Sequence, residues 1–300
     1  PTHRASTLPG YAAVAAAATL WAVAAVVARR LFDDGLSAVE VTESRAVLAA
    51  VGFALVPGVW RPAPGRSRAS AFQLVALGVA LALVNVTYYE AISRIPVAVA
   101  LVIQYTAPAL VVGWAAAGAR RAPSMEVLVA LMAALAGVVL VLEPGGAVAR
   151  MDGTGIAMGV ASAFFFATYT VLAERTGALY GSAAAMGRGF AVASLLWIAF
   201  QAPRGFPDEL VEPAHLPEVL YLGVAGTLVP FFLFAWGVAR VRAERAAIAA
   251  TLEPVVAACV AWAWLDQSLS AVQLAGGALV IAAVAFLQSR ERRPLVAPDV

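Results

Sequence analysis

Polar and aromatic side chains interrupt the long apolar stretches of this 300-residue chain. Asn85 and Tyr89 are four residues apart, so a helix would place them on one face with Tyr88 beside them. Gln104 and Tyr105 occur in the following apolar stretch. Amides and hydroxyls bind the polar groups of small solutes, and aromatic rings beside them suit an amphipathic solute. These residue types predict a binding cavity within the apolar part of the chain.

The acid that we expect deepest among apolar residues is Glu253, immediately before Pro254. An ionisable group in such a place is costly, and three roles are open to it: binding the amino group of a zwitterion, relaying protons, or pairing with an arginine such as Arg188. We expect Arg45 and Arg188 to hold helix ends, and Glu43 with Arg45 resembles a pair at an entrance. The expected lining residues of the cavity are Trp21, Asn85, Tyr88, Tyr89, Gln104, Tyr105, Tyr169, Trp236 and Glu253.

Two prolines, Pro108 and Pro254, lie inside apolar stretches. A proline within a helix frees the carbonyl about four residues upstream, here the carbonyls of Gln104 and Ala250. Freed carbonyls are tolerated where neighbouring helices or a watery cavity satisfy them. We therefore expect both prolines to line a cavity and to act as hinges. The alternative is a packing kink with no ligand nearby.

The composition is that of a membrane protein. Hydrophobic residues make up 62% of the chain and charged residues 13%, whereas soluble domains are nearer one half and one quarter. Apolar runs of about 20 residues, each long enough to cross roughly 30 Å of hydrocarbon as a helix, recur along the chain. We expect an all-α polytopic membrane protein with ten transmembrane helices, at about residues 11–29, 39–59, 71–91, 96–118, 125–143, 154–175, 182–200, 217–239, 244–265 and 270–289.

The chain contains two related halves. Residues 84–143 align with residues 230–289 at a constant offset of 146 without a gap, which pairs the two prolines. Each half holds five apolar stretches, and because this number is odd the two halves must enter the membrane from opposite sides. We expect one five-helix repeat in residues 1–149 and a second, inverted one in residues 150–300. Inverted repeats around a central cavity near the midplane are typical of secondary transporters.

The basic residues indicate an orientation. All 20 are arginine, and thirteen of them fall on one side of the predicted ten-helix topology. By the positive-inside rule this side is cytoplasmic, which places both termini in the cytoplasm. The net charge of +2 follows from this topology and does not indicate a nucleic-acid partner. The fifth and tenth stretches have few polar residues and are rich in Ala and Gly, so we expect them to form a closely packed scaffold.

Motifs for covalent chemistry are absent from the sequence. There is no HExxH, GxSxG or Walker sequence. The two histidines lie in the N-terminal tail and in a predicted loop, and Asp33-Asp34 has no further carboxylates beside it for a metal. We therefore expect no enzyme activity, metal or cofactor, and transport that is passive or coupled to an ion gradient.

The chain resembles the EamA-type branch of the drug/metabolite transporter superfamily over nearly its whole length. Within this branch it is most similar to the YddG group of aromatic-amino-acid exporters. The resemblance implies ten helices around a central cavity and export of amino acids and related compounds from the bacterial cytoplasm. The residues that carry it, besides the two five-helix halves, are Leu20-Trp21, Arg45 with its counterpart Arg188, and the stretches that contain Pro108 and Pro254.

Together these features predict an exporter of aromatic and other neutral amino acids that works by alternating access in the bacterial inner membrane. The alternatives are an exporter of drugs or other small metabolites with the same fold, and a passive pore, for which no selectivity element is visible. The predicted partners are a small-molecule solute and the lipid bilayer. Protons are an open alternative as coupling ions, and both a monomer and a homodimer remain open.

Overall fold

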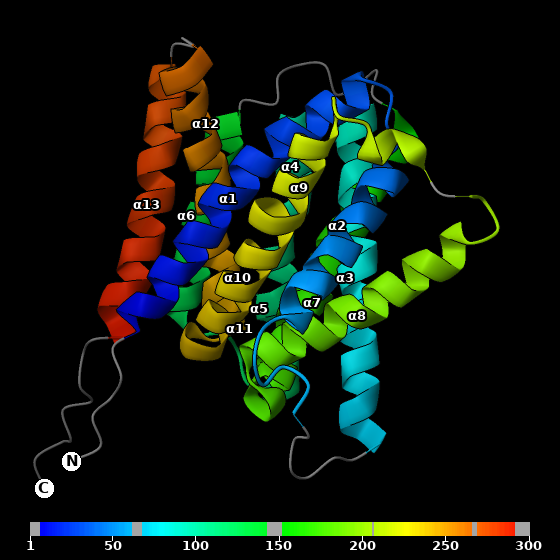
Figure 1. Cartoon of the computed structure of the whole chain (residues 1–300). Coiled ribbons are helices and arrows are strands. Elements are labelled where there is room, and N and C mark those ends of the chain that lie inside the picture. Colours follow the sequence, from blue (N-terminus) through cyan, green and yellow to red (C-terminus); the bar gives the residue numbers. More distant parts are fainter. Residues whose placement is uncertain (1–6, 62–67, 143–151, 206, 266–268, 292–300) are drawn as a thin grey trace, which may run out of the picture.

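The computed structural model describes residues 7–61, 68–142, 152–205, 207–265 and 269–291, and every regular element within these ranges is a helix (Figure 1). A 3₁₀-helix, η2 (Asp208–Val211), precedes α9, and a π-helix, η3 (Val224–Leu228), joins α9 to α10. The α-helices are α1 (Leu8–Asp33), α2 (Ala38–Ala54), α3 (Arg68–Arg94), α4 (Val97–Gln104), α5 (Ala107–Ala119), α6 (Met125–Leu142), α7 (Gly153–Tyr180), α8 (Ser182–Gln201), α9 (Leu216–Gly223), α10 (Val229–Val241), α11 (Ala243–Ala250), α12 (Leu252–Leu265) and α13 (Ala271–Glu291).

Eight helical segments in the described part of the chain are long and apolar enough to cross a membrane. Helices α4 and α5 count as one segment, and α9, η3 and α10 as another. Two predicted spans fall outside this set: α2, which has 17 residues, and the stretch that holds α11 and α12, which have 8 and 14 residues. The all-helical, multi-pass membrane fold is therefore confirmed, and the ten-span arrangement stays a prediction.

Two of the predicted spans are broken at matching places. Helix α4 ends at Gln104 and α11 ends at Ala250, which differ by the sequence offset of 146. Pro108 and Pro254 lie in the first turns of the helices that follow, α5 and α12. A proline is tolerated in the first turn because its missing N–H would have no partner within the helix. Each proline therefore begins a new helix just after the break.

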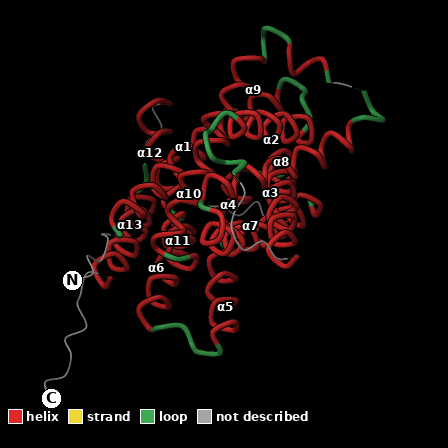
Figure 2. Tube along the Cα trace, turned by 60° about the horizontal axis from the view of Figure 1, so that its bottom comes forward, coloured by secondary structure: helices red, strands yellow, loops and turns green. Residues whose placement is uncertain are grey.

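Three helix pairs that are distant in the sequence pack along one another: α3 with α7, α6 with α13, and α1 with α10. Small residues permit the approach of α6 to α13, because a Cβ atom added at Gly137 would lie 2.7 Å from the carbonyl oxygen of Gly276. Figures 1 and 2 place α6 and α13 on one side of the bundle and α2, α8 and α9 on the other. The close packing of α6 on α13 agrees with the scaffold predicted for the fifth and tenth stretches.

Side-chain caps fix where two of the helices begin. Ser37 and Glu40 form a capping box at α2, in which the Ser37 hydroxyl accepts from the Glu40 N–H at 3.2 Å and the Glu40 carboxylate accepts from the Ser37 N–H at 2.7 Å. Asp152 caps α7, because its carboxylate accepts hydrogen bonds from the N–H groups of Thr154 and Gly155. These hydrogen bonds lower the pKa of Asp152. The cap on α2 sets the register that places Glu43 and Arg45.

Candidate functional site

A small cavity, here called the inner cavity, lies between α1, α2, α3, α7 and α10 at the breaks in the α4–α5 and α11–α12 segments. Its volume is about 50 Å³. This space holds a few water molecules and is well below the roughly 300 Å³ or more of typical ligand sites, so the cavity is closed to a solute. Its lining residues are Trp21, Ala24, Ala25, Arg45, Val84, Asn85, Tyr88, Tyr89, Gln104, Phe166, Phe231 and Glu253.

Six of the nine predicted lining residues border this cavity, from four of the predicted spans. Tyr105 lies directly behind one of them, Glu253, while Tyr169 and Trp236 lie elsewhere. The six are Trp21, Asn85, Tyr88, Tyr89, Gln104 and Glu253.

Arg45 provides a buried positive charge at the inner cavity, with 4% of its surface exposed. Its Nε donates to the Thr227 hydroxyl at 2.6 Å and its Nη2 donates to the Gly226 carbonyl at 2.8 Å. Both partners belong to the π-helix η3, whose wider turn leaves backbone groups for a side chain to bond. The guanidinium also lies over the Tyr89 ring, 4.5 Å from its centroid.

The break in the α11–α12 segment meets the break in the α4–α5 segment through Tyr105. The Tyr105 hydroxyl lies 3.0 Å from the carbonyl oxygen of Ala250 and 2.7 Å from Oε2 of Glu253. The carbonyl of Ala250 is the one that Pro254 was expected to free, and the phenol satisfies it. The hydroxyl has a single proton, so it cannot donate fully to both oxygens. A protonated Glu253 that donates to Tyr105, while Tyr105 donates to Ala250, completes this set of hydrogen bonds.

Aromatic rings form the apolar wall of the inner cavity. Trp21 lies edge-on to Phe166 and Phe231, with ring centroids 6.2 and 5.2 Å away. Phe234 and Tyr169 complete the cluster behind them, with centroids 5.5 Å apart. Tyr169 therefore supports the wall from behind and does not border the cavity.

Two amide side chains face the cavity with bonds already made. Asn85 donates to the carbonyl of Leu81 one turn earlier at 2.7 Å. Gln104 donates to the Ser162 hydroxyl on α7 at 2.6 Å, which ties the end of α4 to α7. Each amide still offers a carbonyl oxygen to a ligand.

Three buried polar groups at the inner cavity have no hydrogen-bond partner in the described structure, namely Trp21 Nε1 and the hydroxyls of Tyr88 and Tyr89. Buried polar groups in proteins are nearly always bonded, because an unpaired one is costly. Unpaired donors at a cavity therefore mark a place where a ligand's acceptor atoms are favoured. Together with Arg45 they give the lining of the cavity several donors suited to an anionic group.

Trp236 does not reach the inner cavity. Its ring lies under the guanidinium of Arg240, 3.2 Å from the centroid, and Arg240 donates to the Trp236 carbonyl. Phe231 and Phe234 are three residues apart and share the inward face of α10, whereas Trp236 is rotated by about 200° from Phe234 around the helix. The helical period of α10 was a signal in the sequence that separates these rings.

Sequence reasoning missed one charged and two aromatic residues of the inner cavity, Arg45, Phe166 and Phe231, besides the small apolar residues Ala24, Ala25 and Val84. Arg45 was expected to hold a helix end, yet it is buried against η3 and borders the cavity. Arg188, within α8, donates to the carbonyl of Arg61 in the segment that follows α2. Glu43 and Arg45 do not form a pair, since they are about 200° apart around α2 and face different cavities.

Metal-ligating side chains do not gather anywhere in the described ranges, where no group of three or more His, Cys, Asp or Glu residues is placed to hold an ion. Cys259 is exposed on α12 and free. The chemistry available at the inner cavity is therefore that of charge, hydrogen bonds and aromatic rings.

Comparison with known proteins decides the family. The model of the EamA-like transporter family matches the chain twice, over residues 8–143 and over residues 153–288. The chain belongs to this family. This EamA-like protein is a membrane transporter of the drug/metabolite transporter superfamily, as the sequence resemblance predicted. The narrower similarity to the YddG group stays a prediction.

Curated relatives of the EamA-like chain are transporters. The inner membrane transporter YicL of Salmonella typhimurium, described as uncharacterized, is 28% identical over 96% of this chain and 98% of its own length. The threonine/homoserine exporter RhtA of Escherichia coli is 27% identical over 70% of this chain and 68% of its own length. One solved structure has a TM-score of 0.69 at 19% identity and covers 96% of this chain and 98% of that one, which shows a shared fold.

Proposed function

We propose that this EamA-like transporter exports small zwitterionic amino acids, aromatic and other neutral ones, across a bacterial inner membrane. One observation carries the proposal: the inner cavity joins a buried cation, Arg45, to a buried acid, Glu253, within a wall of aromatic rings. A free amino acid presents the complementary pair of charges. The export of threonine and homoserine by the related RhtA proteins supports the same solute class.

The solute carboxylate binds Arg45, Trp21 Nε1 and the Tyr88 hydroxyl, which all line the cavity. Arginine matches a carboxylate geometrically and by charge, and the two unpaired donors add bonds that the empty protein lacks. The solute ammonium binds Glu253, which borders the same cavity. The solute side chain lies against the rings of Trp21 and Phe231.

The same proposal includes ten transmembrane helices in two inverted five-helix halves around this central cavity, with both termini cytoplasmic. Two matches to one family model, over residues 8–143 and residues 153–288, support two related halves. The helix breaks after Gln104 and Ala250 support them independently, because they obey the offset of 146. The arginine distribution supports the orientation.

Transport proceeds by alternating access, because a cavity of about 50 Å³ must open to admit an amino acid. The two helix breaks are the proposed hinges, with Pro108 and Pro254 at the start of the mobile segments. Tyr105 joins these breaks by hydrogen bonds, so it holds the closed arrangement. Opening separates the two segments and exposes the cavity to one side of the membrane.

Protons are the proposed coupling ions. The hydrogen bonds around Tyr105 favour a protonated Glu253 in the empty cavity, whereas a bound ammonium requires the carboxylate. Binding of the solute therefore releases one proton, and protonation of Glu253 displaces the solute. This exchange drives export when protons enter from the opposite side.

The test is counterflow in liposomes that contain only the purified protein, preloaded with unlabelled amino acids and supplied with a labelled one. We expect saturable exchange that a pH gradient accelerates, and loss of the gradient effect in Glu253→Gln. No exchange with any amino acid would remove the solute class and direct the search to drugs or other metabolites. Linear uptake without exchange would indicate a pore.

Two conservative variants test the binding wall without breaking existing bonds. Trp21→Phe and Tyr88→Phe remove groups that have no partner in the empty protein, so no existing hydrogen bond is lost while the affinity for the amino acid falls about tenfold per lost bond to a charged group. The matched control is Tyr169→Phe, which removes a buried unpaired hydroxyl away from the cavity. Equal affinities in all three variants would contradict this binding mode.

A further inference from the structure

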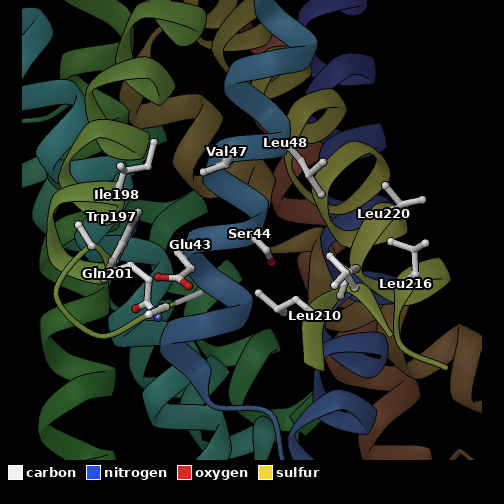
Figure 3. Close-up of a pocket in the computed structure, with 14 residues that line it drawn as sticks. Glu43, Ser44, Val47, Leu48, Trp197, Ile198, Gln201, Leu210, Leu216 and Leu220 are labelled. Atoms are coloured by element: carbon white, nitrogen blue, oxygen red, sulfur yellow. Dashed lines mark hydrogen bonds between the residues drawn. The ribbon is translucent and has the colours of Figure 1, made fainter. Parts of the chain in front are cut away.

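A second and larger cavity, here called the lateral cavity, lies between α2, α8 and α9, apart from the inner cavity. Its volume is about 410 Å³, which is in the range of ligand sites. Figure 3 shows that it is bordered by apolar side chains from all three helices, such as Val47, Ile198 and Leu220. Ile198 and Leu220 are largely exposed on the outer side of the bundle. The cavity therefore opens toward the hydrocarbon of the bilayer.

Two polar groups in this apolar cavity are buried and unpaired. Glu43 has 6% of its surface exposed and Trp197 has 9%, and neither Glu43 Oε2 nor Trp197 Nε1 has a hydrogen-bond partner. Neighbouring polar side chains are already bonded, since Ser44 donates to the carbonyl of Val41 and Gln201 donates to the carbonyl of Gly205. A ligand with a cationic donor and an acceptor would satisfy both the unpaired carboxylate oxygen and the unpaired N–H in this cavity.

Glu43 and Trp197 both lie near an end of their helix. Glu43 is five residues after the start of α2, and Trp197 is four residues before the end of α8. At 1.5 Å per residue along the helix axis both lie roughly 6–8 Å from these helix ends. On α2 the apolar residue Val47 lies one turn farther from the helix start than Glu43.

We propose that the lateral cavity binds a phospholipid with a primary ammonium headgroup. The ammonium donates to Glu43, an ester or phosphate oxygen accepts from Trp197 Nε1, and part of one acyl chain lies against Val47, Ile198 and Leu220. A bilayer lipid is the molecule that reaches this cavity directly, because its mouth faces the hydrocarbon. The site is distinct from the solute site, since Glu43 and Arg45 lie on different faces of α2 and border different cavities.

Two common phospholipid headgroups differ in whether they can donate a hydrogen bond to Glu43. The ammonium of phosphatidylethanolamine has N–H donors, whereas the trimethylated headgroup of phosphatidylcholine carries the same charge without a donor. A buried carboxylate without another partner distinguishes these two lipids, because only the first makes a charge-assisted hydrogen bond with it.

Native mass spectrometry of the delipidated protein with either lipid measures this preference. We expect phosphatidylethanolamine to bind about tenfold more tightly than phosphatidylcholine, as one hydrogen bond to a charged group provides. Glu43→Gln should abolish the preference, and Trp197→Phe should weaken binding of both lipids. The matched controls are Glu126→Gln, an acid that contacts Arg290 on the far side of the bundle, and Trp114→Phe on α5.

Three results would overturn the proposal. The first is equal binding of the two lipids to the wild-type protein, and the second is an unchanged preference in Glu43→Gln. The third is competition by octylamine on equal terms with the phospholipid, which would show that the phosphate and ester groups contribute nothing. Thermal unfolding of each variant establishes that it is folded, and Trp197→Phe provides a separate test if Glu43→Gln does not fold.

Discussion

The hydrogen bonds of Tyr105 give the clearest test of how the two helix breaks are held together. Tyr105→Phe removes a buried hydroxyl that lies 3.0 Å from the Ala250 carbonyl oxygen and 2.7 Å from Glu253 Oε2. A buried polar group that loses its partner costs about 1–3 kcal/mol. Two such groups are affected, so we expect the free energy of unfolding to fall by roughly 2–6 kcal/mol.

The matched control for this change is Tyr169→Phe. Tyr169 is fully buried, yet its hydroxyl has no hydrogen-bond partner. The same atom is removed from the same type of side chain, but no bond is lost. We therefore expect the stability to stay the same or to rise, because a buried unpaired group is eliminated.

Thermal unfolding of both variants in one detergent, followed by tryptophan fluorescence, measures the difference. We expect the midpoint to fall by several degrees in Tyr105→Phe and not to fall in Tyr169→Phe. Equal midpoints for the two variants, or a larger loss in Tyr169→Phe, would refute the claim that Tyr105 satisfies the broken segment. Faster counterflow in Tyr105→Phe would further indicate that its bonds hold the closed arrangement.

Two other regions give independent predictions. Gly137→Ala places a methyl group 2.7 Å from the carbonyl oxygen of Gly276, so we expect a loss of about 1–3 kcal/mol from overpacking; Gly113→Ala, where nothing lies within 4 Å, should instead preserve or raise the melting temperature. Replacing both Pro108 and Pro254 with alanine lets each broken segment form a continuous helix, so flux should fall more than solute affinity does. Unchanged flux in liposomes would remove the hinge role from the prolines.

The sequence predicted the helical membrane fold because hydrocarbon offers no hydrogen-bond partners to the backbone. In a bilayer the backbone groups of a run of about 20 apolar residues bond within one helix, which is long enough to cross the hydrocarbon. The matching prolines likewise pointed to the two places where helices are broken, after Gln104 and Ala250. The inner-cavity residues Asn85, Tyr88 and Gln104 stood out because polar groups in an apolar run are costly.

The positions of the two arginines and of Trp236 could not be read from residue type alone. Arg45 and Arg188 occupy similar places in their halves, yet Arg45 bonds the π-helix at Thr227 and Arg188 bonds the carbonyl of Arg61. A π-helix has no strong sequence pattern, so the partner of Arg45 could not be predicted from the sequence. Trp236 was expected in the cavity because it is aromatic and midspan, but its face of α10 turns it toward Arg240.

The sequence by itself determined the class of the protein, its family and the positions of its helix breaks, since these follow from local composition, motif and spacing. Only the tertiary structure decided which charges share a cavity. Arg45 and Glu253, which are 208 residues apart in the chain, both border the inner cavity, whereas Glu43 borders the lateral cavity. The physical reason is that the helical period assigns a face to each residue, while packing among α1, α2, α3, α7 and α10 decides what each face meets.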